Sequence, residues 1–389
     1  MGGRSRAIIG FDVTAALTQG GGIGRYTRDL IQALVVEAPD FDYKLFSARP
    51  PAVLPVADPL PVAPRVSYHP APFDERWLYR LWYRARLPLP IQSFTGPLDL
   101  FHSPDFVLPP VSGRIPTIVT VHDLSFIHYP ETFPATLVGY LNRVVPWSVD
   151  RAGHILADSE STRRDLQSFW GVAAERITVL YSGVNERFQP VTDAAALNEV
   201  CARYGLQRPF VLAVGTVQPR KNYEMLVRAF RPVADHHPHS LVIVGGKGWL
   251  DEGLPVEIER QGLRERVKLA GFVTDADLPA LYSAADLLAF PSLYEGFGLP
   301  LLEAMACGTP VLSSDASSLP EVAGGGSAML LSPHDESAWS SAMIELLGDP
   351  AARQRLRSAG FDRSTQFGWT AAARQLASLY RRILADHSR

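Results

Sequence analysis

Short, mostly apolar runs rich in β-branched residues alternate along this chain with stretches of helical periodicity, and this alternation constrains its fold most. The runs are Ala7–Phe11, Thr117–Val121, His154–Ala157, Ile177–Tyr181, Phe210–Val214, Leu241–Val244, Val267–Ala270, Leu287–Phe290, Pro310–Ser313 and Met329–Leu331. A strand buried on both faces cannot alternate polar and apolar residues, so unbroken apolar runs indicate parallel sheets covered by helices on both sides. The sequence therefore predicts the α/β fold class.

The same pattern occurs twice, which predicts two Rossmann-like domains. Each half begins with an apolar strand, a glycine-containing turn and an amphipathic helix, Ile23–Val36 in the first half and Asn222–Ala234 in the second. The 389 residues also exceed the usual size of one compact domain. We expect the boundary between Asn185 and Pro209, which gives an N-terminal domain at 1–190, a C-terminal domain at 191–368 and a final helical segment at 369–389.

Charge and cysteine content exclude several protein classes. The formal net charge is -3, so no overall positive field exists to hold nucleic acid. The two cysteines, Cys201 and Cys307, are too few for a disulfide scaffold or a four-cysteine zinc site. We find no apolar run of about 18 residues that predicts a membrane span, and Ala7–Phe11 is too short for a signal-peptide core. We therefore expect a cytoplasmic protein in a reducing compartment.

The strongest local motif is Tyr294–Met305, which follows a predicted strand directly. Gly296 and Gly298 allow a ligand to approach the backbone, and a proline at the start of the next helix leaves N–H groups that can face phosphate. Glu295 precedes this helix and Glu303 lies inside it, so the two carboxylates can accept hydrogen bonds from different hydroxyl pairs of one extended ligand. A helix-capping glutamate and a surface glutamate are the alternative interpretation.

This motif is one of several that occur in the order of a known family. The others are Gly20–Tyr26, Val121–Asp123, Ala157–Ser159, Val214–Asn222, Gly271–Val273 and Gly308–Val311. Together they resemble the retaining glycosyltransferases of family 4, which carry a Glu-x7-Glu motif, and the resemblance spans nearly the whole chain. It implies the GT-B fold, with two Rossmann-like domains facing across a cleft. It also implies that the C-terminal domain binds a nucleotide-sugar donor, that the N-terminal domain binds the acceptor, and that the final helix crosses back to the N-terminal domain.

The resemblance implies roles for individual residues. It implies that Glu295 contacts the donor sugar, that Glu303 holds the ribose and that His122 lies by the donor sugar. The basic pair Arg220 and Lys221 would neutralise the diphosphate, and two fixed cations there would lower the cost of the charge that the leaving group gains. The predicted catalytic residues are His122, Arg220, Lys221 and Glu295. The predicted donor-binding residues are Gly22, Gly24, Gly215, Thr216, Arg220, Lys221, Val273, Glu295, Gly296, Phe297, Gly298, Leu299 and Glu303.

Three of these features also have a purely structural interpretation. His122 can be a hydrogen-bonded packing residue. Arg220 and Lys221 can cap an ordinary surface turn. The Gly20–Gly24 loop, which opens a helix, can bind an anion through its N–H groups or can be a tight turn without a ligand.

The resemblance also implies a reaction. Retaining transfer without an evident carboxylate nucleophile suggests front-face substitution, in which the leaving phosphate takes the acceptor proton. The segment beginning Gly215-Thr216 has threonine where many relatives have arginine, and in this form it resembles members that use GDP-mannose. We predict transfer of α-mannose from GDP-mannose to a saccharide or lipid-linked saccharide acceptor in surface polysaccharide synthesis, without a cofactor.

Other functions stay open. A UDP-sugar-dependent transferase of glucose or N-acetylglucosamine, a sugar-nucleotide epimerase, a phosphorylase and a non-catalytic sugar-nucleotide binder would use the same architecture. An NAD-dependent oxidoreductase is disfavoured, because Gly20–Gly24 lacks the full dinucleotide spacing and the ribose-binding acid is missing.

Two groups of residues resemble metal sites. Asp275 and Asp277 form an Asp-x-Asp pair, but they precede a helix predicted from Leu278, so we interpret them as an N-cap. Three clustered histidines are expected to be solvated: His236, His237 and His239. We therefore expect no metal.

Two further segments have distinctive compositions. The basic, aromatic segment Arg76–Arg86 can pack on the core with its arginine stems along the edge. Alternatively, it can lie peripherally on an anionic membrane face or hold a lipid-linked acceptor. The proline-rich stretch Pro50–Pro72 is expected to be a loop.

Overall fold

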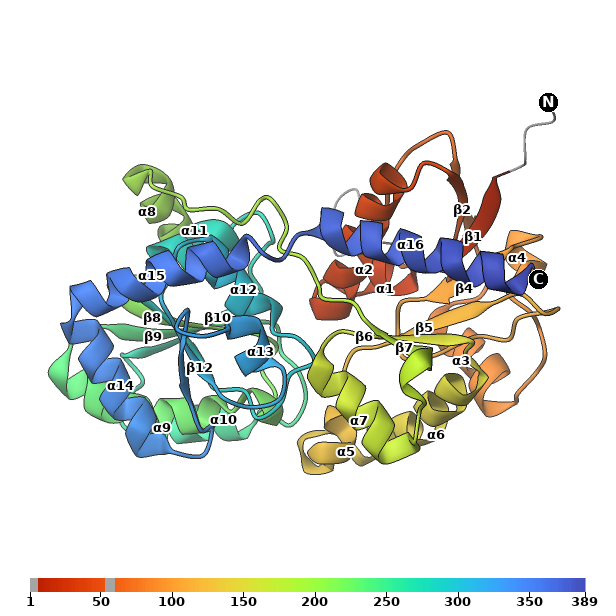
Figure 1. Cartoon of the computed structure of the whole chain (residues 1–389). Helices are drawn as coiled ribbons and strands as arrows, with labels where there is room; N and C mark the ends of the chain where they lie inside the picture. Colours follow the sequence, from red (N-terminus) through yellow and green to blue (C-terminus); the bar gives the residue numbers. More distant parts are fainter. Residues whose placement is uncertain (1–5, 53–59, 389) are drawn as a thin grey trace. The chain divides into compact units, whose positions relative to one another are not determined.

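Two parallel β-sheets flanked by helices organise the chain, which the computed structural model describes at residues 6–52 and 60–388 (Figure 1). The contacts divide the chain into unit 1, with residues 1–124, 139–183 and 368–389, and unit 2, with residues 125–138 and 184–367. The sequence prediction ends the N-terminal domain at 190 and includes 125–138 in it. The contacts instead end the main part of unit 1 at 183 and group 125–138 with unit 2.

The sheet of unit 1 has the strand order β3-β2-β1-β4-β5-β6-β7. Its strands are β1 (Ala7–Asp12), β2 (Phe41–Ser47), β3 (Val66–Pro70), β4 (Leu100–Ser103), β5 (Thr117–Val121), β6 (His154–Ala157) and β7 (Ile177–Val179). The expectation that Pro50–Pro72 is only a loop is wrong for its last part, because β3 pairs with β2 there. Residues 53–59 of that stretch lie outside the described residues.

Helices flank the sheet of unit 1. They include α1 (Thr14–Thr18), α2 (Gly22–Glu37), α3 (Glu75–Tyr79), a π-helical turn (Arg80–Arg84), α4 (Gln92–Thr95), α6 (Ala135–Arg151, whose first turn belongs to unit 2), α7 (Glu160–Trp170) and α16 (Trp369–His387). The buried face of α16 joins the same core cluster as α2 and β1. Its Tyr380 hydroxyl lies 2.6 Å from Nδ1 of His102 in β4, and its Arg381 makes two hydrogen bonds to Asp40. The final helix is therefore part of unit 1.

The sheet of unit 2 has the order β10-β9-β8-β11-β12-β13. Its strands are β8 (Phe210–Val214), β9 (Ser240–Val244), β10 (Val267–Gly271), β11 (Leu287–Phe290), β12 (Val311–Ser314) and β13 (Met329–Leu331). Its helices include α5 (Ser125–His128), α8 (Ala194–Arg203), α9 (Tyr223–His236), α10 (Gly253–Arg260), α11 (Leu278–Ala284), α12 (Leu299–Ala306), α13 (Leu319–Ala323), α14 (Glu336–Gly348) and α15 (Pro350–Ser364). Short 3-10 turns lie at Pro130–Thr132, Ala174–Arg176 and Pro219–Lys221.

Strand β8 shows why this sheet could be predicted from apolar runs. Leu212 and Val214 pack into one core cluster, with α8, α11 and α12, whereas Val211 and Ala213 pack into another, with α9, α10 and α14. Both faces of the strand are buried, so every position is apolar.

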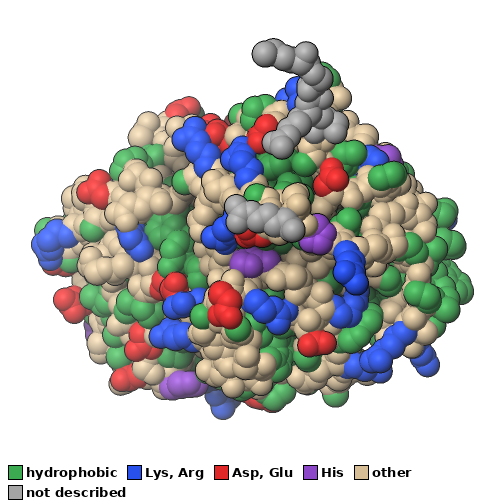
Figure 2. Space-filling model, turned by 45° about the vertical axis from the view of Figure 1, so that its right-hand side comes forward, with side chains coloured by type: hydrophobic (Ala, Val, Ile, Leu, Met, Phe, Trp, Pro, Cys, Tyr) green, Lys and Arg blue, Asp and Glu red, His purple; other side chains and the backbone are tan. Residues whose placement is uncertain are grey.

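Both sheets therefore follow the Rossmann order, in which the third, second, first and fourth strands of the unit lie side by side. The predicted fold of two Rossmann-like domains is confirmed. In the described ranges, no helix is long and apolar enough to cross a membrane. On the face that Figure 2 shows, basic and acidic side chains are interspersed rather than gathered into a field of one sign.

Candidate functional site

A cluster of three charged side chains lies at the carboxyl ends of β8 and β11, where the strand order of unit 2 reverses and where Rossmann-like folds bind ligands. Nζ of Lys221 donates to Oε1 of Glu295 over 2.6 Å, and Nη1 of Arg220 lies 3.2 Å from Oε2 of the same carboxylate. Lys221 and Glu295 are both buried. The 3-10 turn Pro219–Lys221 presents both cations, and the N–H of Leu293 donates to the carbonyl of Arg220, which ties the two loops together.

Electrostatics keeps Glu295 ionised. Burial alone would raise its pKa, but the charges of Lys221 and Arg220, together with the hydrogen bond from Lys221, lower it to about 2. The cluster is therefore a buried carboxylate held between two cations. The two cations lie at the carboxyl ends of the strands. An anionic ligand that displaces the Glu295 carboxylate can therefore bind to them.

The turn that carries Glu295 is fixed from two sides. Gly298 has φ +108° and is the N-cap residue of α12, a backbone conformation that favours glycine. The hydroxyl of Ser318 donates to the carbonyls of Glu295 and Phe297 over 2.9 and 3.0 Å. Because Gly298 occupies the cap position and the Glu295 carboxylate pairs with the two cations, Glu295 does not act as a helix cap.

The second glutamate of the motif is also buried. Glu303 is 2% exposed, and its Oε2 accepts a hydrogen bond from the Tyr282 hydroxyl over 2.9 Å. A surface glutamate is therefore the wrong interpretation for this position.

The other predicted donor-binding residues of unit 2 divide into core and loop positions. Val273 and Phe297 are buried in the core, and Leu299 packs against that core, so these side chains have a structural role. Gly215 follows β8 directly, and Thr216 next to it is exposed. The loop that holds Arg220 and Lys221 therefore begins with a half-buried glycine and an exposed threonine.

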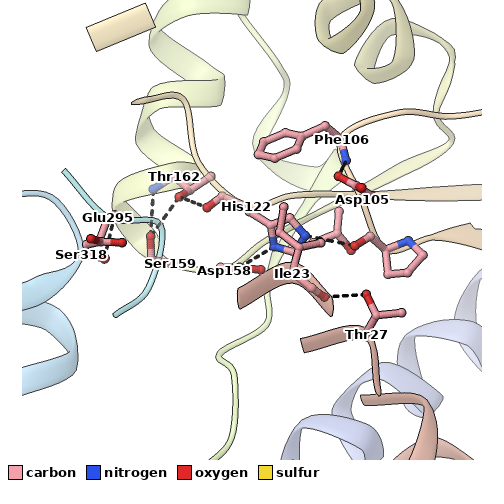
Figure 3. Close-up of polar contacts among 12 residues, drawn as sticks. Ile23, Thr27, Asp105, Phe106, His122, Asp158, Ser159, Thr162, Glu295 and Ser318 are labelled. Atoms are coloured by element: carbon pink, nitrogen blue, oxygen red, sulfur yellow. Dashed lines mark hydrogen bonds and ion pairs between the residues drawn. The ribbon is translucent and has the colours of Figure 1, made fainter. Parts of the chain in front are cut away.

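His122, at the end of β5, forms a second buried charged pair, in unit 1 (Figure 3). Its Nδ1 lies 2.7 Å from Oδ2 of Asp158, and its Nε2 lies 3.0 Å from the carbonyl oxygen of Pro104. The rings of Tyr26 and Phe106 pack edge-on against the imidazole. Both ring nitrogens face oxygen atoms, and with Asp158 ionised both donate, which is the arrangement of the protonated imidazolium.

The pKa values agree with this geometry. Burial alone would lower the pKa of His122, but the charge and hydrogen bond of Asp158, the charge of Asp105 and the Pro104 carbonyl raise it to about 9. As arranged, the imidazole has no free lone pair with which to accept a proton. The arrangement therefore favours a positively charged His122 over a general base.

The glycines in the first turn of α2 occupy one open and one crowded position. A Cβ at Gly22 would contact nothing within 4 Å, whereas a Cβ at Gly24 would lie 2.0 Å from the carbonyl oxygen of Gln19. The Arg28 guanidinium donates to the carbonyls of Ala16 and Gln19, which holds the preceding turn in place. Gly22 can thus face a ligand, and Gly24 is needed for the close approach of two backbone segments.

The structure brings some predicted site residues together and separates others by unit. Arg220, Lys221 and Glu295 form one cluster, and Glu303 is on the helix that follows it. His122, Gly22 and Gly24 belong to unit 1. No role was predicted for Asp158, which lies within the Ala157–Ser159 motif, or for Ser318. Asp158 directly follows β6, the strand that pairs with β5, and this position could have indicated a partner for His122. No local sequence feature indicated Ser318.

The predictions for the Asp-x-Asp pair and for the histidine cluster are each wrong in part. Asp277 does occupy the N-cap position of α11, but its side chain makes no capping bond. It accepts hydrogen bonds from Arg203, the Tyr204 hydroxyl and Thr274 instead. His239 is buried, with Nε2 3.2 Å from Asp286, so the expectation that it is solvated is wrong. Within residues 6–52 and 60–388, no three His, Cys, Asp or Glu side chains are grouped so that they could hold a metal ion.

Comparisons with known proteins identify the family. Residues 203–363 match the family described as Glycosyl transferases group 1, and residues 20–188 match Glycosyltransferase Family 4. The chain is 32% identical to O-antigen chain mannosyltransferase B of Escherichia coli, over 92% of this chain and 96% of that one. It also resembles D-inositol 3-phosphate glycosyltransferase of Corynebacterium glutamicum, at 29% identity over 78% of this chain and 80% of that one.

The fold is shared with solved structures. Sucrose-phosphate synthase from Thermosynechococcus elongatus matches with a TM-score of 0.74 and 23% identity, covering 98% of this chain and 100% of that one. The identity and coverage shared with the mannosyltransferase, and the two family matches, agree with the motifs. The chain therefore belongs to glycosyltransferase family 4, the group 1 glycosyl transferases.

Proposed function

We propose that this protein transfers an α-mannosyl residue from GDP-mannose to a saccharide or lipid-linked saccharide acceptor, with retention of configuration, in the synthesis of a surface polysaccharide. The relative with 32% identity is a mannosyltransferase of O-antigen chains, which supports the sugar and the class of product. The segment that starts at Gly215 supports the donor, because its form resembles members that use GDP-mannose.

The single observation that carries the proposal is the carboxylate of Glu295 between Lys221 and Arg220. A nucleoside diphosphate that binds at these cations competes with Glu295 for them. Once the diphosphate is bound, the same cations stabilise the negative charge that it gains as the bond to the sugar breaks. Glu295 is then available to accept hydrogen bonds from hydroxyl groups of the donor sugar.

In the proposed step, the bond between the anomeric carbon and the diphosphate oxygen breaks while the acceptor oxygen bonds to the same face of the sugar. The departing diphosphate oxygen takes the proton of the acceptor hydroxyl, so no separate base is needed. We propose that the reaction needs no metal, because Arg220 and Lys221 supply the positive charge beside the leaving group.

The first experiment is a thermal-shift panel of GDP-mannose, GDP, UDP-glucose, UDP-N-acetylglucosamine and UDP, since a ligand that binds the native state raises the melting temperature. We expect a selective shift with GDP and GDP-mannose. A shift with UDP and UDP-sugars alone would mean that the donor is a UDP-sugar. No shift with any nucleotide would contradict the proposal. Transfer to mannosides in the presence of EDTA, followed by NMR of the product anomer, then tests the metal and the stereochemistry.

A further inference from the structure

The inference concerns the segment Arg76–Arg86 of unit 1, in which arginines and aromatic residues are interleaved. It comprises most of α3 (Figure 1) and the π-helical turn that follows directly. Leu78, Trp82 and Tyr83 are buried, and Nε1 of Trp82 donates to the carbonyl of Leu89 over 2.8 Å. Of the two interpretations of this sequence, packing on the core is therefore correct for the buried positions.

The exposed positions of the segment are mostly basic. Arg76, Arg80, Arg84 and Arg86 are all exposed to solvent. In the part of the chain that the structure describes, none of these four guanidinium groups forms an ion pair or a hydrogen bond with another residue. The packing that buries one side of the segment therefore leaves its cations available to a partner.

The two acidic residues at the start of α3 do not neutralise these arginines. Asp74 is the N-cap residue, and its Oδ1 accepts a hydrogen bond from the N–H of Trp77 over 3.0 Å. Its Oδ2 lies 3.9 Å from Nη2 of Arg49. Glu75 forms no ion pair within residues 6–52 and 60–388. The segment therefore keeps a local excess of positive charge, although the whole chain has a net charge of -3.

Large apolar side chains are exposed among these arginines and beside them. Trp77 is 52% exposed, Leu87 is 47% exposed and Phe73 is 38% exposed. The Arg80 guanidinium lies 5.0 Å from the centre of the Trp77 ring, so a cation and an aromatic ring share one surface there. Tryptophan is enriched at membrane–water interfaces, because its ring is apolar and its N–H is polar.

We propose that the exposed side of this segment binds the surface of an anionic lipid bilayer. In this arrangement the arginines contact lipid phosphates, and Phe73, Trp77 and Leu87 insert among the headgroups. Anionic headgroups attract basic segments, and an amphipathic helix lies at a bilayer surface with its apolar side chains at the headgroup boundary. The planar guanidinium also presents donors in a fork that matches phosphate. This inference does not depend on the proposed donor or acceptor.

The combination of charge and apolar surface favours a bilayer over a nucleic acid or an acidic protein. Contacts with phosphate or carboxylate groups alone would use the arginines but would leave Phe73, Trp77 and Leu87 without a partner. A bilayer offers an anionic surface and an apolar layer beneath it. Four arginines within the eleven residues of Arg76–Arg86 also match the basic clusters that anionic membranes bind.

The test is flotation of the full chain with vesicles of pure phosphatidylcholine and with vesicles of an equal mixture of phosphatidylcholine and phosphatidylglycerol. We expect binding to the mixed vesicles only, and we expect it to weaken as added salt screens the charges. Arg76→Gln/Arg80→Gln should weaken binding about 25-fold, since each basic residue near an anionic surface contributes about fivefold. Trp77→Ala should weaken it about tenfold, because the apolar ring is no longer buried among the headgroups.

The matched control removes the same charge from two other helices of unit 1. Arg164 in α7 and Arg382 in α16 are both exposed, and Arg164→Gln/Arg382→Gln should bind the mixed vesicles like the wild type. The substituted side chains are exposed in every variant, so the melting temperatures should be close to that of the wild type. An unchanged melting shift with GDP shows that unit 2 is unaffected.

Three outcomes would overturn the inference. The first is equal binding to both kinds of vesicle, and the second is equal binding by the wild type and Arg76→Gln/Arg80→Gln. The third is binding to double-stranded DNA or polyglutamate without binding to the mixed vesicles, because the partner would then not be a bilayer. Nucleotide binding and sugar transfer are measured without vesicles, so a failure of the proposed function is seen in a different assay.

Discussion

Replacing Glu295 with glutamine tests the charged cluster of unit 2 most directly. The substitution keeps the shape of the side chain and removes the charge that Lys221 and Arg220 share. The buried Lys221 and the partly buried Arg220 then have no anion between them, which is costly in a site largely shielded from water. We expect the free protein to lose stability.

The pKa of Glu295 gives the magnitude. Its fall from 4.5 to about 2 means that the folded protein favours the ionised carboxylate by about 3 kcal/mol, and the glutamine variant loses this amount at neutral pH. A lowered pKa stabilises the fold above the unfolded value of 4.5, and this contribution is lost as the pH falls towards 2. The difference in unfolding free energy between the wild type and the variant should therefore be constant above pH 4.5 and shrink below it.

Urea unfolding with and without GDP measures the stability of the free protein and the stabilisation by the nucleotide. GDP supplies the missing anion, so it should stabilise Glu295→Gln more than it stabilises the wild type, in which the nucleotide must compete with the carboxylate. The exposed Glu345→Gln is the matched control and should change neither value. A variant as stable as the wild type without ligand, or an equal GDP effect in both proteins, would refute the reasoning.

Four other substitutions test separate parts of the structure. Lys221→Ala should lower kcat/KM for GDP-mannose by about 10²–10³, because it removes one cation beside the leaving group; near-normal turnover would contradict the site. The raised pKa of His122 stabilises the fold below pH 6.5, and this is lost as the pH rises through about 9. The loss of unfolding free energy caused by Asp158→Asn, measured with urea, should therefore be larger at pH 6 than at pH 9. Gly24→Ala should destabilise by about 1–3 kcal/mol, whereas Gly22→Ala, with open space around it, should not.

The strands could be predicted where their residues form an unbroken, mainly apolar run. All six strands of unit 2 coincide with apolar runs, to within a residue at each end. In unit 1, β2 alternates buried and half-buried positions around Asp42 and Lys44, β3 is a largely exposed edge strand, and β4 is only four residues long. An alternating strand, an exposed edge strand and a strand whose buried residues include His102 and Ser103 have no unbroken apolar run, so these three were missed.

The boundaries of the two units depend on contacts that local pattern does not contain. Residues 125–138 pack with unit 2 because Tyr294 stacks on His128, and the Trp249 indole donates to the carbonyl of Thr132 over 2.9 Å. These partners are more than 100 residues apart. A pattern of apolar residues predicts that a helix exists, but it does not predict which sheet the helix joins.

The same limit applies to the candidate site. The types of residue and their positions after strands predicted Arg220, Lys221, Glu295 and His122 as candidates. Their pairing depends on side-chain directions, so neither the bond from Lys221 to Glu295 nor that from His122 to Asp158 could be predicted. That His122 is a cation follows only from the two acceptors around its ring.

The paired and unpaired groups predict different ligand preferences. In unit 2, Lys221 and Arg220 are already satisfied by Glu295, so a ligand binds there only if its negative charge competes with a buried carboxylate. A diphosphate meets this requirement, and a neutral sugar does not. In unit 1, Asp12, Glu75 and Asp105 line a cavity of about 510 Å³, and none of them forms an ion pair with a lysine or arginine among the described residues. Carboxylates accept hydrogen bonds and repel anions, so this lining favours hydroxyl donors over phosphate groups.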